Sequence, residues 1–299
     1  MPPRAADILD QLADLQGLTA AADLDSVIAH LHQPLEHYAE LELRSDGRRI
    51  DLITLSDQPE VPAHFLDLVQ TRGALPPEAA AAAVDLLRFG AGKVVGMKLP
   101  LAGPLAGGEV YLRGAIPLAE AAYFLRKNQV EPETLDCLMQ IAASFGKNHT
   151  HMLAADVASV PGYTVFFTTY LTPESEGRDW EMVGHALEAI GIQAETIASL
   201  EPLHALLGAN RPATLFFSWA IADGVGRKIA KMDYTGVRVG LVAELMHLVG
   251  ADESLPITWG RLLHMNRANY AGLIVDAQGL AGARAYFTRR LQILDEGSA

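Results

Sequence analysis

Several sequence features that would each indicate a particular class of protein are scarce or missing in this chain. Its 299 residues include one cysteine, Cys137, which lies in an apolar pattern of helical spacing and rules out a disulfide framework within the chain. No run of about 18 or more uncharged apolar residues is present, which excludes a membrane-spanning helix. The first residues turn acidic and amphipathic at once, unlike a secretory signal. We therefore expect a protein of the reducing cytoplasm.

Positive charge is scarce as well. Lys and Arg number 23 against 36 Asp and Glu, so the formal net charge is −13. This balance argues against nucleic acid and against an anionic membrane surface, because both need a basic face. It is compatible with a small anionic substrate, since a few cations inside a pocket outweigh distant surface carboxylates that salt screens. The expected partner is a small molecule, and we expect the chain to act as a monomer.

Hydrophobic residues, by contrast, make up 50% of the chain and follow a repeated pattern. Five pairs of short alternating segments, each joined by a turn rich in glycine or other turn-forming residues, predict five β-hairpins. The predicted strand pairs are Tyr38–Arg44 with Arg48–Leu55, Val94–Leu101 with Glu109–Pro117, Met152–Ser159 with Tyr163–Leu171, Thr214–Ala222 with Arg227–Tyr234, and Asn269–Val275 with Ala283–Thr288. Helical periodicity separates the pairs and predicts helices over 5–35, 61–72, 77–90, 118–127, 132–146, 179–190, 200–208, 237–249 and 256–266. No stretch has the composition of a flexible linker, so we expect residues 1–299 to form one domain.

Each predicted strand divides into two faces, because alternate side chains of a strand point in opposite directions. One face is strongly apolar and should be covered by helices. The other mixes charged, polar and aromatic side chains, namely Glu40, Glu42, Arg44, Asp51, Lys98, Tyr111, Arg113, Asp156, Thr164, Phe166, Thr168, Phe217, Trp219, Lys231, Asp233, Arg284 and Tyr286. An open antiparallel sheet with one face in water would also alternate in this way. Large aromatics on the polar face favour closure into a barrel, with helices outside and a lumen wide enough for small molecules.

The polar face carries residue types that suit a diphosphate. Lys and Arg neutralise its charge and phenolic groups bind its oxygens, and the candidates are Lys98, Tyr111, Arg113, Lys231, Arg284 and Tyr286. Asp51 is a candidate ligand of Mg²⁺, which often binds one carboxylate together with phosphate oxygens and waters. The rings of Phe166 and Trp219 are suited to shielding a carbocation through cation–π attraction. This set is typical of the transfer of an allylic group from its diphosphate to an electron-rich acceptor.

Several strand-sized segments resemble the soluble aromatic prenyltransferases with the ABBA barrel, which is built from repeated α-β-β-α units. RRIDLITLS resembles the family strand with a magnesium-binding aspartate, at Asp51. GGEVYLRGAIP resembles a diphosphate-binding strand, with Tyr111 and Arg113 directed inward. RKIAKMDY resembles the strand with a diphosphate-binding arginine, here Lys231, and ARAYF resembles the last strand, with its inward tyrosine at Tyr286. YTVFFTTYL matches a strand with inward positions that fall on Thr164 and Phe166.

The resemblance implies a fold, an activity and a set of roles. The fold is an α+β, ten-stranded antiparallel β-barrel of five αββα repeats with the helices outside. The activity is transfer of a dimethylallyl or geranyl group from its diphosphate to an aromatic small molecule, with Mg²⁺ required only in some members. The catalytic set would be Lys231, Arg113, Tyr111 and Tyr286. Further contacts with the two substrates would come from Lys98, Thr164, Arg284, Phe166, Phe217 and Trp219.

Other interpretations remain open. A non-catalytic barrel that binds a lipophilic ligand would show the same alternation. His149 and His151 have the spacing of paired metal ligands, although no third ligand follows at suitable spacing. Glu40 and Glu42 are candidates to accept a proton from the acceptor molecule, or else to form ion pairs near Arg44.

Overall fold

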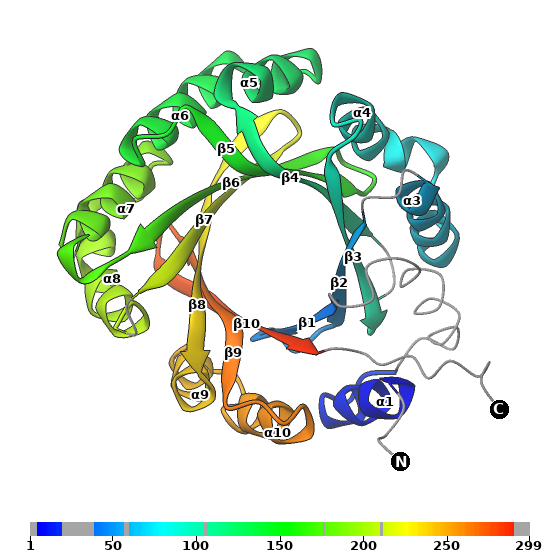
Figure 1. Ribbon diagram of the computed structural model, residues 1–299, viewed down its shortest axis with the longest axis vertical. Helices are drawn as coiled ribbons and strands as arrows, with labels where there is room; N and C mark the ends of the chain where they lie inside the picture. Colours follow the sequence, from blue (N-terminus) through cyan, green and yellow to red (C-terminus); the bar gives the residue numbers. More distant parts are fainter. Residues whose placement is uncertain are drawn as a thin grey trace.

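Ten antiparallel strands close into a barrel in the computed structural model of the chain (Figure 1). The structure describes residues 5–19, 39–56, 60–104, 107–175, 177–209 and 212–289. The strands are β1 (Ala39–Arg44), β2 (Ile50–Ser56), β3 (Val94–Ala102), β4 (Gly108–Pro117), β5 (His149–Val157), β6 (Gly162–Leu171), β7 (Ala213–Ala222), β8 (Val225–Arg238), β9 (Arg267–Asp276) and β10 (Gly279–Arg289). Each strand pairs with its neighbours in sequence, and pairing of β1 with β10 completes the ring. The predicted antiparallel barrel is thus confirmed.

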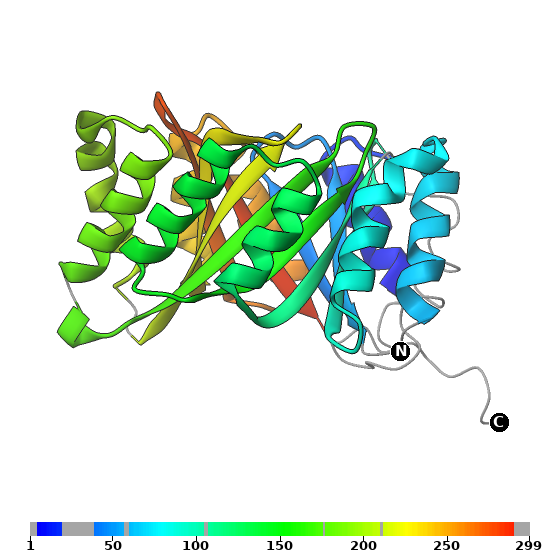
Figure 2. The ribbon, with the colours of Figure 1, turned by 90° about the horizontal axis from the view of Figure 1, so that it is seen from above.

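The helices lie around the outside of this barrel (Figures 1 and 2). They are α1 (Ala5–Leu15), α3 (Glu60–Gly73), α4 (Ala81–Phe89), α5 (Leu118–Lys127), α6 (Pro132–Ser144), α7 (Arg178–Ala189), α8 (Ala194–Leu207), α9 (Val239–Leu248) and α10 (Ser254–Leu262), with single 3₁₀ turns at Pro77–Ala80 and Pro173–Ser175. The predicted helix over 5–35 ends at Leu15 in the part that is described, and its section from 20 onward lies outside the described residues. None of the described helices is long and apolar enough to cross a membrane.

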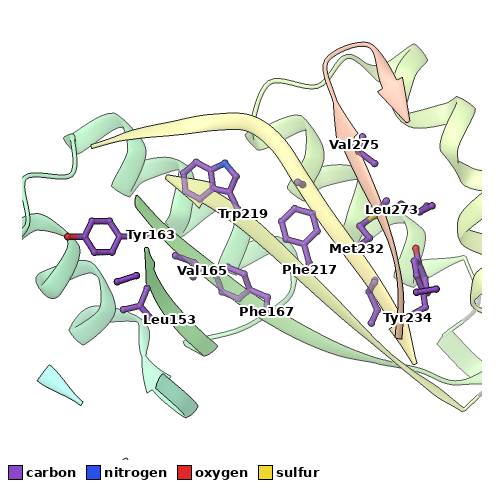
Figure 3. Packing of buried hydrophobic residues seen from close by; sticks show 14 of the residues in the cluster. Leu153, Tyr163, Val165, Phe167, Phe217, Trp219, Met232, Tyr234, Leu273 and Val275 are labelled. Atoms are coloured by element: carbon purple, nitrogen blue, oxygen red, sulfur yellow. The ribbon is translucent and has the colours of Figure 1, made fainter. Parts of the chain in front are cut away.

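The outer face of the sheet is apolar on strand after strand. Residues at alternate positions, such as Leu52, Leu99, Val165, Leu215 and Leu273, are fully buried in one large hydrophobic core. Figure 3 shows part of this core, with Val165 and Leu273 among the labelled residues. The helices contribute the other half of this core with their own apolar faces. Burial of this layer removes apolar surface from water and supplies the main force that holds the helices on the barrel.

On β7 the alternation runs opposite to the sequence-based prediction. Phe217 and Trp219, which we expected in the lumen, lie on the outer face in the hydrophobic core (Figure 3). The ring of Phe217 packs against Phe145, with 5.3 Å between ring centroids. The indole N–H of Trp219 donates to the backbone oxygen of Arg227 at 2.8 Å. Neither residue can therefore contact a ligand inside the barrel.

The physical reason lies in the two residue sets of β7. The outward set consists of Leu215, Phe217, Trp219 and Ile221, and each of them is at most 1% exposed. The inward set includes Ser218, whose hydroxyl would cost free energy if it faced the helices without a partner. The uniformly apolar set is the one that gains most from contact with the helices, so it faces outward.

Candidate active site

The lumen contains a cavity of about 310 Å³, lined by inward residues of all ten strands. This volume is at the lower end of the range for small-molecule sites, about 300–1,000 Å³. Most residues predicted for the site line it, namely Lys98, Tyr111, Arg113, Thr164, Phe166, Lys231, Arg284 and Tyr286. The structure therefore brings together side chains from five strands that are far apart in the sequence, within one cavity.

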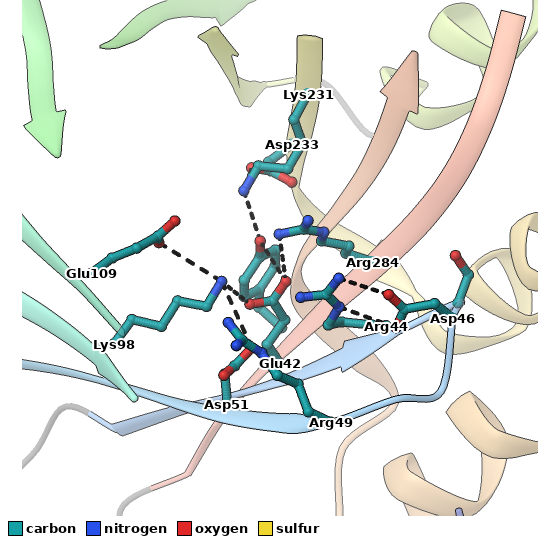
Figure 4. Close-up of polar contacts among 12 residues, drawn as sticks. Glu42, Arg44, Asp46, Arg49, Asp51, Lys98, Glu109, Lys231, Asp233 and Arg284 are labelled. Carbon is teal, nitrogen blue, oxygen red and sulfur yellow. Dashed lines mark hydrogen bonds and ion pairs between the residues drawn. The ribbon is translucent and has the colours of Figure 1, made fainter. Parts of the chain in front are cut away.

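Lys98 lies in a buried cluster of charges (Figure 4). Its Nζ is 2.5 Å from Oε2 of Glu42 and 3.8 Å from carboxylate oxygens of both Asp51 and Glu109. Oε1 of Glu42 accepts a hydrogen bond from Nη1 of Arg284 at 2.8 Å. Burial alone would raise the pKa of Glu42, but Lys98 and Arg284 hold it well below its usual range. Glu42 is thus an anion enclosed by cations, even though none of its surface is exposed.

A second contact group joins this cluster from β8. Nζ of Lys231 donates to the hydroxyl of Tyr286 at 2.8 Å and lies 3.1 Å from Oδ2 of Asp233. Burial raises the pKa of Tyr286 well above its usual value, so the phenol stays neutral. Gly272 leaves the room that Asp233 needs, because a Cβ at this position would lie 2.0 Å from Oδ1 of Asp233. A lysine and a tyrosine that are 55 residues apart in the sequence are thus held together at the cavity wall.

Asp51 does not offer the surroundings that a magnesium ion needs. It is fully buried, is not part of the cavity wall, and its Oδ2 accepts from Nε of Arg49 at 3.0 Å. With Lys98 also 3.8 Å away, the carboxylate already has two cations beside it, and their charges disfavour a divalent ion. Among the residues that the structure describes, no three His, Cys, Asp or Glu gather into a possible metal site. The predicted metal-binding role of Asp51 therefore does not fit this geometry.

His149 and His151, at the start of β5, do not form a metal site with other ligands in the described part of the chain either. Nδ1 of His149 lies 3.1 Å from the side-chain oxygen of Asn148. The ring of His151 packs against Phe216 with 5.4 Å between centroids. Burial lowers the pKa of His151, and Arg113 lowers it further, so this imidazole is mainly neutral near pH 7.

Aromatic rings form two groups along the cavity. Tyr111 and Phe166 meet edge to face, with 6.1 Å between centroids. Phe216, Tyr270 and Tyr286 form a row with centroid distances of 5.4 and 6.1 Å and nearly perpendicular planes. All five rings line the cavity. Such π faces attract a positive charge and exclude water, which suits a chamber in which a carbocation forms.

A pair of carboxyl groups lies on the wall formed by β4 and β5. Glu109 and Asp156 are direct partners in the pairing of these strands, and both line the cavity. The hydroxyl of Tyr111 donates a hydrogen bond to Glu109. Burial, reinforced by the charge of Glu109, raises the pKa of Asp156 to about 7. Asp156 can therefore exchange a proton close to neutral pH.

Solved structures of aromatic prenyltransferases share this architecture. The 6-dimethylallyltryptophan synthase from Micromonospora olivasterospora, solved in complex with DMASPP and Trp, has a TM-score of 0.70 and 13% identity, over 96% of this chain and 97% of that one. The chain has the aromatic prenyltransferase barrel fold. The 5-dimethylallyltryptophan synthase from Streptomyces coelicolor matches with a TM-score of 0.66 and 15% identity, over 96% and 94% of the two chains. The prenyltransferase PriB matches with a TM-score of 0.63 and 14% identity, over 95% and 94%. No protein-family profile and no curated protein sequence matches the chain.

Within this prenyltransferase barrel, several lumen residues were not foreseen from the sequence. They are Glu109, Met152, Phe216, Ser218 and Tyr270. Glu109 shares its face of β4 with Tyr111 and Arg113, so the strict alternation of that strand predicts that Glu109 also faces the lumen. Phe216 and Ser218 follow once the more apolar set of β7 is assigned to the helices.

Proposed function

We propose that the chain is an aromatic prenyltransferase that moves a dimethylallyl or geranyl group from its diphosphate to an aromatic small molecule. The observation that carries this proposal is a cavity inside the barrel whose wall combines Lys98, Lys231, Arg284 and Tyr286 with further aromatic rings. It is supported by PriB, which shares the fold and was solved with L-tryptophan and dimethylallyl thiolodiphosphate. From the sequence we further propose a cytoplasmic monomer that acts as a single domain.

The diphosphate would bind the cations and phenols of the lumen. Lys231, Arg284 and Tyr286 come from β8 and β10, and Lys98 reaches the same region from β3. As the bond between the allylic carbon and the diphosphate oxygen breaks, the electron pair leaves with the diphosphate. Fixed cations and hydrogen-bond donors stabilise that developing charge without reorganisation. These are groups of the chain itself, so the step as proposed needs no metal ion.

The aromatic groups would protect the allylic cation until the acceptor attacks. A carbon of the acceptor ring forms the new bond, and the proton at that carbon must then leave. Asp156 lines the cavity, and with a pKa of about 7 it is suited to receive that proton. Glu40 also lines the cavity, whereas Glu42 is held in ion pairs with Lys98 and Arg284.

One observation favours a second candidate, a non-catalytic barrel that binds a lipophilic ligand. Three cations of the lumen are already paired with carboxylates, Lys98 and Arg284 with Glu42 and Lys231 with Asp233. A diphosphate has to compete with these internal anions. A neutral, lipophilic ligand would need only the aromatic and aliphatic parts of the wall.

A transfer assay separates the two candidates. The protein is incubated with dimethylallyl or geranyl diphosphate and a panel of indoles and phenols, and products are identified by mass. We expect an adduct that is one prenyl group heavier than its acceptor. Binding of an acceptor or a prenyl chain without any adduct across the panel would favour the non-catalytic barrel.

Variants then test the assignment of the diphosphate. Lys231→Ala should lower kcat about 100-fold, because one fixed charge at the leaving group is lost. Lys228→Ala is the matched control, since Lys228 lies on the same strand but is exposed. Arg113→Ala should also lower kcat if Arg113 contacts the diphosphate. Wild-type rates in both Lys231→Ala and Arg113→Ala would show that these residues do not hold the leaving group.

A further inference from the structure

The groups that the proposed function assigns to the diphosphate converge on one carboxylate. Lys98 and Arg284 each contact a different oxygen of Glu42, at 2.5 and 2.8 Å. The hydroxyl of Tyr286 lies 3.5 Å from the same carboxylate and itself accepts from Lys231. Figure 4 shows Lys98 and Arg284 directed toward Glu42 from separate strands. The carboxylate of Glu42 therefore lies at the centre of a set of side chains that are suited to binding an anion.

Glu42 lies behind the cavity wall and not in it. None of its surface is exposed and it does not line the cavity. Lys98 and Arg284, by contrast, contact Glu42 and also face the cavity. Each cation can thus hold Glu42 on one side and a ligand on the other. A negative charge at this position offsets part of the attraction that the two cations exert on an anionic ligand, and burial keeps salt from screening it.

The charge of Glu42 is fixed over the working pH range. Lys98, Arg284 and Lys231 all lower its pKa, and they outweigh the opposite effect of burial. Asp51, Glu109 and Asp233 face the same cations from β2, β4 and β8. Of these carboxylates, only Glu42 contacts two cations through separate oxygens in the described part of the chain. Among these four carboxylates, Glu42 should accordingly weaken the binding of an anionic ligand the most.

We propose that Glu42 is a positioning residue, an internal counter-anion that holds Lys98 and Arg284 in place and limits the affinity of the lumen for diphosphate. This inference rests on the proposed function for the identity of the anion. During turnover, Glu42 would stay paired with both cations as diphosphate leaves, which lowers the free-energy cost of product release. The cations would then never be left without a partner inside the barrel.

Calorimetric titration with inorganic diphosphate tests the proposal without any prenyl transfer. Glu42→Gln keeps the shape of the side chain and removes its charge. We expect this variant to bind diphosphate more tightly than the wild type, on the order of tenfold. Asp67→Asn, which removes one negative charge from the exposed side of α3, should stay within about twofold of the wild type. Raising the salt concentration should leave the difference between Glu42→Gln and wild type largely intact.

A second variant keeps the test decisive if Glu42→Gln does not fold. Glu42→Asp retains the charge but is one methylene shorter, so it cannot contact both cations as closely, and we expect an affinity between those of the wild type and Glu42→Gln. An unchanged or weaker affinity in a folded variant would overturn the proposal. So would a failure of both the wild type and the folded variants to bind diphosphate.

The transfer assay gives an independent readout. Inhibition by the diphosphate product should appear at about tenfold lower concentration in Glu42→Gln than in the wild type. Tighter diphosphate binding in Glu42→Gln without prenyl transfer by any protein would support the role of Glu42 and contradict the proposed function. Prenyl transfer by the wild type with no gain in diphosphate affinity in Glu42→Gln would do the reverse.

Discussion

The two faces of the same ten strands obey different rules. On the outer face, residues such as Phe217 and Leu273 pack against helices with no polar neighbour required. On the inner face, Lys98, Arg284 and Lys231 each contact a carboxylate, because a buried charge without a partner is strongly unfavourable. The outer face therefore stabilises the barrel, whereas the inner face holds buried charges, and ion pairing reduces the free-energy cost of burying them.

This difference has a consequence for substitutions. A change on the outer face removes packing, and the cost depends on the volume lost. A change on the inner face removes one member of a charge network, and the cost depends on which charge stays behind. The four predictions below compare the faces, in order of decreasing expected effect.

The largest effect is expected from Lys98→Met on the inner face. It leaves Glu42, Asp51 and Glu109 without their shared cation, and the free energy of unfolding should fall by about 3–5 kcal/mol. Urea unfolding at pH 7 measures it. Adding Glu42→Gln to Lys98→Met should restore part of the loss. If the double variant instead shows the sum of the two single losses, the pair is not coupled.

Phe217→Ala and Phe216→Ala form the sharpest pair, since the residues are neighbours in sequence on opposite faces. Phe217 is fully buried against Phe145, and its removal should cost about 3 kcal/mol of unfolding free energy. Phe216 borders the cavity, so its removal should cost less than half of that but change the affinity for aromatic ligands. Equal losses of stability would contradict the assignment of the two faces on β7.

The pH dependence of stability should depend on Asp156. Its pKa of about 7 in the folded chain lies above the usual value of 3.8, so the folded state binds more protons between these two pH values. Stability should consequently fall as pH rises from about 4 to 7. Asp156→Asn keeps a hydrogen-bond donor for Glu109 and should be more stable than the wild type at pH 8, by on the order of 2 kcal/mol.

Unfolding curves at pH 5 and pH 8 measure this effect, with Asp67→Asn as the control for the loss of one charge. The difference between Asp156→Asn and the wild type should shrink toward pH 4. A difference that does not vary with pH would show that Asp156 does not titrate near neutrality.

The smallest effect concerns a polar contact on the outer face. The hydroxyl of Tyr234 lies 2.8 Å from Nδ1 of His204 on α8, and both residues are buried. Tyr234→Phe should lower the free energy of unfolding by about 1 kcal/mol, the typical net value of a hydrogen bond. A loss as large as that of Lys98→Met would mean that polar contacts on the two faces are equally important.

The sequence predicted the strands well but one strand's orientation poorly, for a specific reason. On β4 and β10 the two alternate sets differ clearly in polarity, and Tyr111, Arg284 and Tyr286 were placed correctly in the lumen. On β7 both sets contain large aromatics, and taking Phe217 and Trp219 as lumen residues reversed the strand. Glu109 was missed because it stands at the first position of its predicted strand, next to the turn.

Local pattern by itself determined the ten strands, the hairpins that join them and the existence of one apolar and one polar face, because alternation and turn chemistry act over a few residues. Only the tertiary structure decided which charge meets which. Glu42 and Arg284 are 242 residues apart and contact each other solely because β1 pairs with β10 to close the barrel. Ion pairs across a closed sheet depend on that closure, which no local pattern encodes.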